Sequence, residues 1–411
     1  MGMASKMTFG RYDYAAFSSM IAYALGSMIV PIALVEIALS LDFPLDDGGK
    51  GLGGALQLAR SVPMVATMLL CGFAAGRWGK CRTQGTALLG IAVGIAAIAL
   101  APSYGILFAA MIVAGLGEGV LEGLLTPFVQ DLHPEEPGRY INFTHSFWSV
   151  GVVLATLGAG ALLQAGISWR LLAGAIATAA ALPAFLMLCP GRNCPPYPER
   201  QRVTPGRVVW QRAARILRRP RFWIYFAAMF LAGGGEYCLT FWVASLIKED
   251  YSGGAWLAGV GTAVFALGMV AGRMYFGYKV PQERLPHLIM AMAALGVAAG
   301  MFFPLLDSLP WLLALLLPLG VASAPFWPSV QSHCAARLAA DRVDNTMLFV
   351  LLSCAGVPGC GFFAFLMGWV GDHVGLRDSF YLVPLCYGIM GALVAGDWLA
   401  ARRNSQPARA G

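Results

Sequence analysis

The side chains best suited to chemistry in this sequence are a few ionisable residues that lie inside long apolar runs. Glu118 and Glu122 are four residues apart, so a helix would place them on one face. A low dielectric and a like charge nearby both favour the protonated form of a carboxylate, so at least one of the two is expected to hold a proton at neutral pH. The alternative is that one carboxylate only forms a structural pair with an arginine or a histidine.

A second group follows one run further along. Asn142, His145 and Trp148 recur every three residues and would form one polar and aromatic stripe on a helix. Glu122 and His145 lie ~13 Å and ~9 Å along their helices from the loop that joins them, so their depths are comparable. We hypothesise that these two residues are partners. They would form either a proton relay, because histidine titrates readily, or a hydrogen-bonded structural clasp.

The third candidate is Glu236, which follows Gly233, Gly234 and Gly235 directly. Glycines would let the helix bend or unwind, and an unwound helix at mid-depth is a recurring binding device. The alternative is glycine-mediated packing beside a hydrogen-bonded glutamate. Polar groups beside aromatic faces suit a sugar-like or other polar solute. The predicted substrate-binding residues are Glu118, Asn142, Trp148, Glu236, Tyr237 and Trp242.

Two further charges lie near one end of the first two apolar runs. Glu36 lies toward the end of the first run, and Arg60 lies about ten residues into the second from the same side. A pair between them would neutralise both charges. We expect such a pair either to form part of a gate or to have a structural role alone.

The elements that carry these residues are predicted from composition. Hydrophobic residues make up 58% of the 411 residues and charged residues 12%, about half the charged share of an ordinary soluble chain. Each membrane span needs about 20 apolar residues. The sequence therefore predicts an all-α integral membrane protein with twelve spans. They fall at 14–40, 52–76, 83–102, 104–131, 140–165, 168–189, 222–247, 254–279, 285–306, 309–331, 346–371 and 379–401.

The spans divide into two sets of six around a polar linker. We predict an N-terminal bundle at 1–189, a basic linker at 190–221 and a C-terminal bundle with a short tail at 222–411. The linker holds nine of the 28 Lys and Arg residues. Beside membrane spans such a run is a topology determinant rather than a nucleic-acid site.

The basic residues also predict the orientation of the chain. With the N-terminus in the cytoplasm, only Lys50, Arg170, Lys248 and Arg377 fall on the outer side, and Arg60 lies within a span. Basic residues concentrate on the cytoplasmic side of membrane proteins. Both termini and the linker are therefore predicted to be cytoplasmic.

The two sets of spans echo each other. Residues 72–80 (GFAAGRWGK) follow the second span, and residues 268–279 (GMVAGRMYFGYK) follow the eighth. Both segments place small residues, then Arg, Gly and Lys, at a predicted cytoplasmic turn. Six-plus-six spans with internal similarity are typical of secondary transporters, whose binding site lies near mid-membrane between the repeats. The predicted bundles are therefore pseudo-symmetric.

These features resemble the major facilitator superfamily. The turn matches the family motif Gly-x-x-x-Asp-Arg-x-Gly-Arg-Arg at Gly72, Arg77, Gly79 and Lys80, but Gly76 stands at the acidic position. The resemblance implies a gating role for Arg77, Gly79 and Lys80, while the missing carboxylate puts the family's cytoplasmic latch in doubt. A narrower resemblance to the fucose-permease and sugar-transporter branch is carried by Gly117, Glu118, Gly119, Glu122, Asn142, His145, Gly151, Gly234, Gly235, Glu236 and Tyr237.

The resemblance and the embedded charges together predict a secondary transporter of a small polar solute that works by alternating access. The sequence has no Gly-x-x-x-x-Gly-Lys-Ser/Thr segment, so an ion gradient rather than ATP would drive it. Embedded carboxylates make protons the first choice of coupling ion, with Glu122 and His145 as the coupling residues. Uncoupled facilitated diffusion stays open.

Two alternative functions are compatible with twelve spans. An exporter of amphipathic or metal-chelating compounds would need a more aromatic, Met-lined cavity. A membrane enzyme or a non-transporting scaffold or sensor would need clustered catalytic groups or a further domain, and the sequence has neither. We expect no cofactor, no metal site and a monomer in the lipid bilayer. The excess of Arg over Lys, 23 to 5, hints at a bacterial inner membrane.

Overall fold

The fold of the protein is all-helical over the part of the chain that is described. The computed structural model describes residues 7–135, 137–189, 196–198, 206–339 and 345–405. Twelve helical segments in these ranges are long and apolar enough to cross a membrane, which confirms the predicted number of spans.

The first half and the linker contain seven helices. They are α1 (Arg11–Ser40), α2 (Lys50–Trp78), α3 (Lys80–Leu100), α4 (Tyr104–Leu132), α5 (Pro137–Gln164), α6 (Trp169–Leu188) and the linker helix α7 (Gly206–Leu217). A short 3-10 helix, Leu45–Asp47, joins α1 to α2.

The second half contains eight α-helices in the described ranges, because two of its spans are divided into two helices each. Its helices are α8 (Pro220–Glu249), α9 (Ala255–Lys279), α10 (Leu285–Phe302), α11 (Leu309–Ser323), α12 (Phe326–Arg337), α13 (Asn345–Val374), α14 (Leu376–Ser379) and α15 (Leu382–Ser405). Together α11 and α12 form the tenth span, and α14 and α15 form the twelfth. The tenth span breaks next to Pro325, because proline cannot donate the backbone hydrogen bond that a continuous helix requires.

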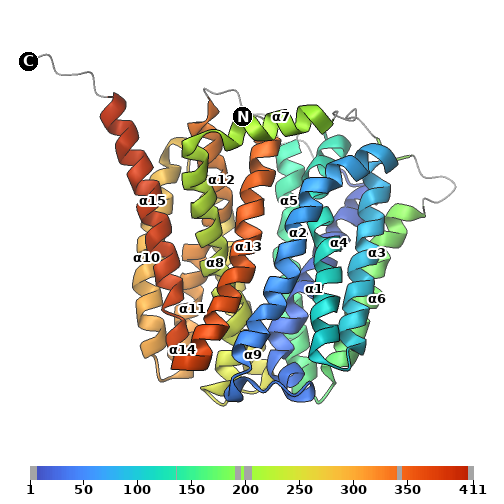
Figure 1. Ribbon diagram of the computed structural model, residues 1–411, viewed down its shortest axis with the longest axis vertical. Helices are drawn as coiled ribbons and strands as arrows, with labels where there is room; N and C mark the ends of the chain where they lie inside the picture. The colour runs from blue at the N-terminus through green and yellow to red at the C-terminus, as the bar shows by residue number, and fades with distance from the viewer. Residues whose placement is uncertain (1–6, 136, 190–195, 199–205, 340–344, 406–411) are drawn as a thin grey trace, which may run out of the picture.

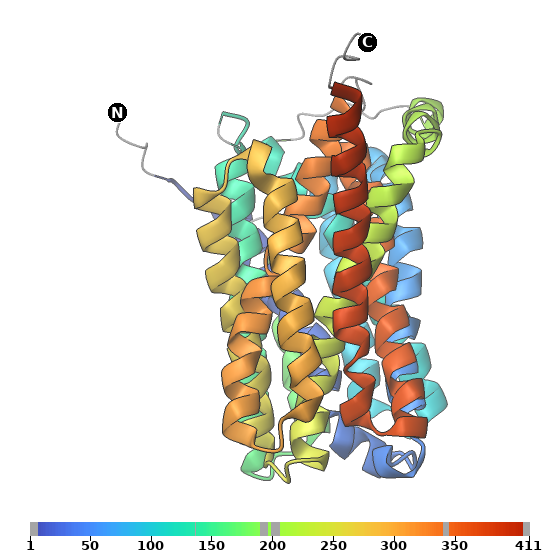
Figure 2. The ribbon, with the colours of Figure 1, turned by 90° about the vertical axis from the view of Figure 1, so that its left-hand side faces the viewer.

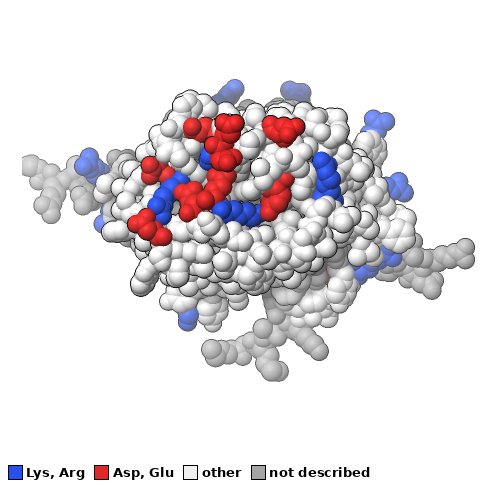
Figure 3. All heavy atoms as spheres, turned by 90° about the horizontal axis from the view of Figure 1, so that it is seen from below, with Lys and Arg blue, Asp and Glu red and all other residues white. Residues whose placement is uncertain are grey.

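The helices run along the long axis, and the two ends of the bundle differ (Figures 1 and 2). The start of α1, the end of α15 and the linker helix α7 lie at one end, which we call the linker end (Figure 1). At the opposite end, aspartate and glutamate side chains gather around a few basic ones (Figure 3). We call this the acidic end. The first and last spans therefore begin and end on the same side as α7, as an even number of spans requires.

Large apolar side chains cover much of the outside of the bundle. Leu100, Leu171, Phe185, Trp311 and Leu385 are each more than half exposed. A protein dissolved in water rarely exposes so much apolar surface, whereas lipid tails solvate it well. The protein is therefore an integral multi-pass membrane protein.

The two halves contact each other through matching helices. The second span, α2, packs against the eleventh, α13, and the fifth, α5, packs against the eighth, α9. Exchanging the halves exchanges these two contacts, as a pseudo-twofold axis requires. The division at 1–189, 190–221 and 222–411 stays a prediction, and within the linker the structure adds α7, which the polar composition did not suggest.

Close packing within the first half depends on a row of glycines on α4. Gly115, Gly119 and Gly123 recur every four residues and all face α2. A Cβ atom at Gly119 would overlap the Met64 carbonyl oxygen. Small residues at this spacing let helix backbones approach closely in membranes. The glycine row therefore sets the short α2–α4 distance that the buried charges between these helices require.

We expect Gly119→Ala to destabilise the protein by about 1–3 kcal/mol, the usual cost of forcing an extra group into a packed interface. Thermal unfolding of the purified protein in detergent would show a lower midpoint. Gly158→Ala is the matched control, because no atom lies within 4 Å of a Cβ atom at that position. Equal midpoints for the two variants would contradict the packing role of Gly119.

Candidate functional site

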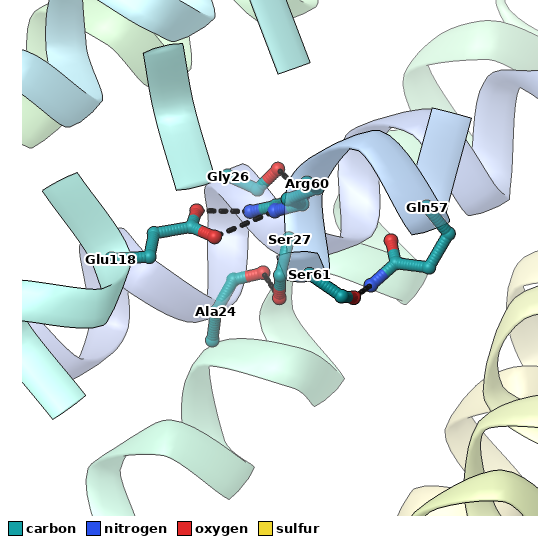
Figure 4. Close-up of polar contacts among 7 residues, drawn as sticks. All are labelled: Ala24, Gly26, Ser27, Gln57, Arg60, Ser61 and Glu118. Atoms are coloured by element: carbon teal, nitrogen blue, oxygen red, sulfur yellow. Dashed lines mark hydrogen bonds and ion pairs between the residues drawn. The ribbon is translucent and has the colours of Figure 1, made fainter. Parts of the chain in front are cut away.

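The most deeply buried charges form an ion pair between α2 and α4. The Arg60 Nε donates to Glu118 Oε2 at 2.6 Å, and a second guanidinium nitrogen donates to Glu118 Oε1 (Figure 4). Arg60 Nη1 also donates to the Gly26 carbonyl of α1 at 3.1 Å. The two residues are 1% and 0% exposed. Three helices of the first half are thus held together by one two-pronged pair.

The second pair lies in the other half and is much looser. Arg273 Nη2, on α9, lies 3.4 Å from Glu236 Oε1 on α8. The Arg273 guanidinium also lies 6.0 Å from the ring centre of Trp148, which belongs to α5 of the first half. The side chain of Arg273 is 30% exposed. This pair therefore faces the other half and is partly accessible, in contrast to Arg60 and Glu118.

Glu122 and His145 do not pair, so the predicted contact between them is wrong for this conformation. His145 Nε2 lies 3.4 Å from the Thr126 hydroxyl. Within the described ranges, no hydrogen bond or ion pair reaches the partly buried Glu122 carboxylate. One turn separates Glu122 from Glu118, and Glu118 directs its carboxylate into the bundle toward Arg60. Glu122 therefore has a like charge nearby and no arginine of its own.

Aromatic and sulfur-containing side chains lie between the halves at the same depth. Met64 and Met68 of α2 pack with Val357 of α13, and Tyr23 and Trp327 cover this cluster. Tyr23 and Tyr237 lie near the Arg60–Glu118 pair. Beside them, a small pocket between α5, α8 and α9 is lined by Trp148, Ser149, Val152, Thr240, Thr262, Phe265, Ala266 and Met269. The charged groups therefore have mainly apolar and aromatic neighbours.

Trp242 and the glycine run have structural roles in this conformation. The helix α8 continues without a break from Pro220 to Glu249, so the expected unwinding at the glycines is wrong. Gly233, Gly234 and Gly235 instead make room for Gly356, Phe363 and Tyr387. Trp242 is fully buried, and its indole nitrogen donates to the Ala364 carbonyl at 2.9 Å. The structure does not bring Trp242 to the site.

The predicted pair of Glu36 with Arg60 is also wrong. Glu36 accepts two hydrogen bonds of 2.7 Å from Lys248, on α8 of the other half. Arg60 lies deeper in the bundle and donates to Glu118 and to the Gly26 carbonyl instead. Since the bilayer interior penalises an unpaired charge, each residue takes the oppositely charged neighbour at its own depth. Glu36 is therefore paired with Lys248 across the halves, and a gating role for Glu36 remains a prediction.

Two further contacts join the halves at the acidic end. The Asp372 carboxylate, on α13, accepts hydrogen bonds from the backbone nitrogens of Lys50 (2.9 Å) and Gly51 (2.7 Å) at the start of α2. A carboxylate at a helix N-terminus satisfies free backbone donors and the helix dipole together. The Gln164 side chain of α5 accepts from the Trp256 backbone nitrogen of α9 at 3.3 Å. The halves are therefore closed against each other at the acidic end.

The family-like turn lies at the linker end. Gly79 has a φ of +85°, a conformation that favours glycine, and it separates α2 from α3. Lys80 pairs with Asp131 of α4 at 2.6 Å, and Arg77 is exposed. The Lys80 pair stays within the first half. A gating role for Arg77, Gly79 and Lys80 remains a prediction.

Three residues with contacts at or between the halves were not predicted from the sequence. Arg273 pairs with Glu236, Lys248 pairs with Glu36, and Asp372 caps the start of α2. The likeness of residues 268–279 to residues 72–80 predicts Arg273 at a cytoplasmic turn, like Arg77. However, α2 ends at Trp78 and α9 ends at Lys279, so Arg273 lies more than a turn deeper in its helix. The helix end at Lys279 was the signal that could have shown this. The side chain of Asn142, a predicted substrate contact, lies outside the described residues.

A metal centre has no support in the described ranges, where no group of three His, Cys, Asp or Glu residues is placed to hold an ion. The site is instead two arginine–glutamate pairs and one further glutamate between two helical halves. Such a set can hold a proton and can bind polar groups of a solute.

Comparison with known proteins identifies the class. Residues 15–358 match the model of the Major Facilitator Superfamily. The chain therefore belongs to the Major Facilitator Superfamily, and it is a secondary transporter rather than an enzyme. No curated protein sequence matches it.

Solved structures share the fold at low identity. The chain is similar to the E. coli fucose:proton symporter (16% identity, 96% of this chain and 98% of that chain, TM-score 0.65). It is also similar to a D-xylose–proton symporter (14% identity, 95% of this chain and 96% of that chain, TM-score 0.73). A third similar structure is a bacterial homolog of the human lysosomal transporter Spinster, in an inward-facing and occupied conformation. It shares 16% identity, covers 97% of this chain and 98% of that chain, and has a TM-score of 0.71. These likenesses confirm the predicted fold class.

We expect Arg60→Gln or Glu118→Gln to destabilise the protein by about 3–5 kcal/mol, because each leaves a buried charge without its partner. The double variant Arg60→Leu/Glu118→Leu should recover much of this loss. Thermal unfolding in detergent measures both effects. Asp307→Asn provides the control, since Asp307 is 91% exposed in its pair with Arg377. Additive losses in the double variant would show that the two charges do not depend on each other.

We expect Lys248→Gln to loosen the closed acidic end, because it leaves Glu36 without its partner across the halves. A Ser245→Cys reporter, one turn from Lys248 and buried here, should then react faster with a maleimide in detergent. The same reporter with Lys279→Gln is the control, since Lys279 is exposed at the end of α9. An unchanged labelling rate in Lys248→Gln would exclude a latch at this position.

Proposed function

We propose that this transporter moves a small polar, sugar-like solute together with protons by alternating access, in a bacterial inner membrane with both termini in the cytoplasm. The observation that best supports proton coupling is the carboxylate of Glu122, which has no hydrogen-bond or ion-pair partner among the described residues. Three glutamates and two arginines occupy the site, and each arginine already has a glutamate.

The charge balance gives Glu122 its role. A charged carboxylate without a cation is costly in a low-dielectric bundle, and a bound proton removes that cost. The partial exposure of Glu122 leaves a route for the proton. Because Glu118 is held by Arg60, Glu122 is the carboxylate on α4 whose proton occupancy can change during a transport cycle. His145 is then a neighbour of the proton site through Thr126 rather than a direct relay partner.

The contacts between the halves support alternating access. At the acidic end, the halves are joined by Glu36–Lys248 and by Asp372 at the start of α2. At the linker end, pairs such as Lys80–Asp131 and Arg337–Asp397 each stay within one half. This pattern fits a conformation that is closed at the acidic end and opens by rocking the halves about the site.

The orientation follows from the charges. Basic residues are concentrated in the linker and the loops at the linker end, whereas acidic side chains outnumber basic ones at the opposite end (Figure 3). The positive-inside rule then places the linker end in the cytoplasm, so the described conformation would face inward.

The choice of a sugar-like solute is supported by the aromatic and polar groups around the site and by the fold shared with two sugar–proton symporters. Trp148, Tyr23 and Tyr237 offer ring faces and hydroxyl groups at mid-depth. The resemblance of the α4 and α8 motifs to the fucose-permease branch points in the same direction.

One observation favours a second candidate, an exporter of amphipathic compounds. Met64, Met68 and Val357 form an apolar cluster between the halves, covered by Tyr23 and Trp327. Methionine-rich surfaces adapt to varied apolar ligands. Import of polar sugars but not of amphipathic dyes into proteoliposomes would separate the two candidates.

The proton role of Glu122 predicts that Glu122→Gln abolishes accumulation driven by a pH gradient. A glutamine cannot release or take up a proton, so uptake into proteoliposomes should lose its dependence on the gradient while exchange of solute continues. The assay uses a panel of labelled sugars and sugar acids with an imposed pH gradient. Glu283→Gln is the control, since Glu283 is exposed in the loop before α10. Full gradient-driven uptake by Glu122→Gln would exclude this role.

A further inference from the structure

The two arginines of the site differ in how much of their hydrogen-bonding capacity is used. Arg60 donates to both oxygens of Glu118 and to Gly26, and it is 1% exposed. Among the described residues, Arg273 donates only two hydrogen bonds, both at the outer limit of hydrogen-bonding distance. They are 3.4 Å from Nη2 to Glu236 and 3.4 Å from Nε to the Ala324 carbonyl. A guanidinium group carries five donors, so Arg273 has donors to spare.

The position of Arg273 brings groups from several helices around its spare donors. Glu236 comes from α8, and Ala324 lies where α11 gives way to α12. Trp148 comes from α5, and His145 on the same helix interacts with Arg273 electrostatically. The side chain of Arg273 is 30% exposed, and it lies beside Trp148 of the other half. A ligand bound there would contact both halves at once.

The surroundings select the charge of that ligand. Arg273 is the partly accessible cation of the site, and its single glutamate leaves donors that a further acceptor can use. A planar guanidinium matches a carboxylate with two parallel hydrogen bonds. With Glu122 protonated, the two arginines balance Glu118 and Glu236. A bound monocarboxylate then adds one negative charge to the site, whereas a dianion such as a phosphate ester adds two and costs more in a low-dielectric bundle. The Trp148 ring offers an apolar or stacking surface beside the carboxylate.

We propose that Arg273 binds the carboxylate of a small organic acid, of the sugar-acid type, as the transported substrate. This inference rests on the proposed function and narrows its solute class. Arg273 keeps Glu236 on one edge of the guanidinium and takes the substrate carboxylate on another. One monocarboxylate crossing with one proton on Glu122 carries no net charge. Transport is then driven by the pH gradient and does not respond to the membrane potential.

The test compares sugar acids with the matching neutral sugars on the purified, reconstituted protein. The probes are D-gluconate, D-glucuronate and D-galacturonate against D-glucose and D-galactose. Binding is followed by ligand-induced thermal stabilisation and by quenching of tryptophan fluorescence, and uptake is followed with labelled probes. We expect at least one acid to bind and to accumulate under a pH gradient, and the neutral sugars to do so at least tenfold more weakly.

Variants of Arg273 connect this preference to the residue. Arg273→Gln should weaken binding of the acid by tenfold or more, and Arg273→Lys should restore part of it, because lysine keeps the charge but not the two-pronged geometry. Arg284→Gln is the matched control, since Arg284 is exposed in the loop after α9. An Arg273→Gln protein with an unchanged midpoint of thermal unfolding shows that a loss of binding is not a loss of folding.

The outcomes separate this inference from the proposed function. Proton-driven uptake of a neutral sugar, with no binding of any acid in the panel, would overturn the carboxylate site and leave proton-coupled transport intact. Binding of an acid that Arg273→Gln leaves unchanged would also overturn it. Uptake of an acid that ignores the pH gradient would instead contradict the proton coupling while the Arg273 site stands.

Discussion

The structure depends on the cost of placing charge in a low-dielectric bundle within a membrane. Arg60 and Glu118 lie at its centre, and neither can be solvated there. Their two-pronged contact makes the pair tolerable, and it forces α1, α2 and α4 to stay together. The glycine row on α4 permits this contact because it brings the backbones of α2 and α4 close. The first half is therefore built around a charge pair as much as around an apolar core.

The same constraint explains how the second half differs. Glu236 and Arg273 satisfy each other only loosely, and Arg273 turns toward Trp148 across the boundary between the halves. A tight pair is suited to hold helices in place, whereas a loose and partly exposed pair is suited to exchange partners. One half thus supplies a rigid framework and the unpaired Glu122, and the other supplies the accessible cation.

Closure at the acidic end uses contacts of another kind. Lys248, Asp372 and Gln164 reach across the boundary to a side chain, to a helix N-terminus and to a backbone nitrogen. These groups lie at the acidic end of the bundle, whereas Arg60 and Glu118 lie in its interior. In the proposed cycle, the contacts at the acidic end would break and the interior pair would persist.

The sequence by itself determined the number of spans and singled out Glu118, Glu122 and Glu236 as charges inside apolar runs. Each follows from a local rule, since about 20 apolar residues are needed to cross a bilayer and a charge in such a run stands out. Only the tertiary structure decided which charges pair. Glu36 pairs with Lys248 and not with Arg60, and Arg273 pairs with Glu236. These partners depend on the depth of each residue in the bundle and on packing between helices that are distant in sequence. The burial of Trp242 and the unbroken α8 were decided in the same way, by neighbours that no spacing along the chain reveals.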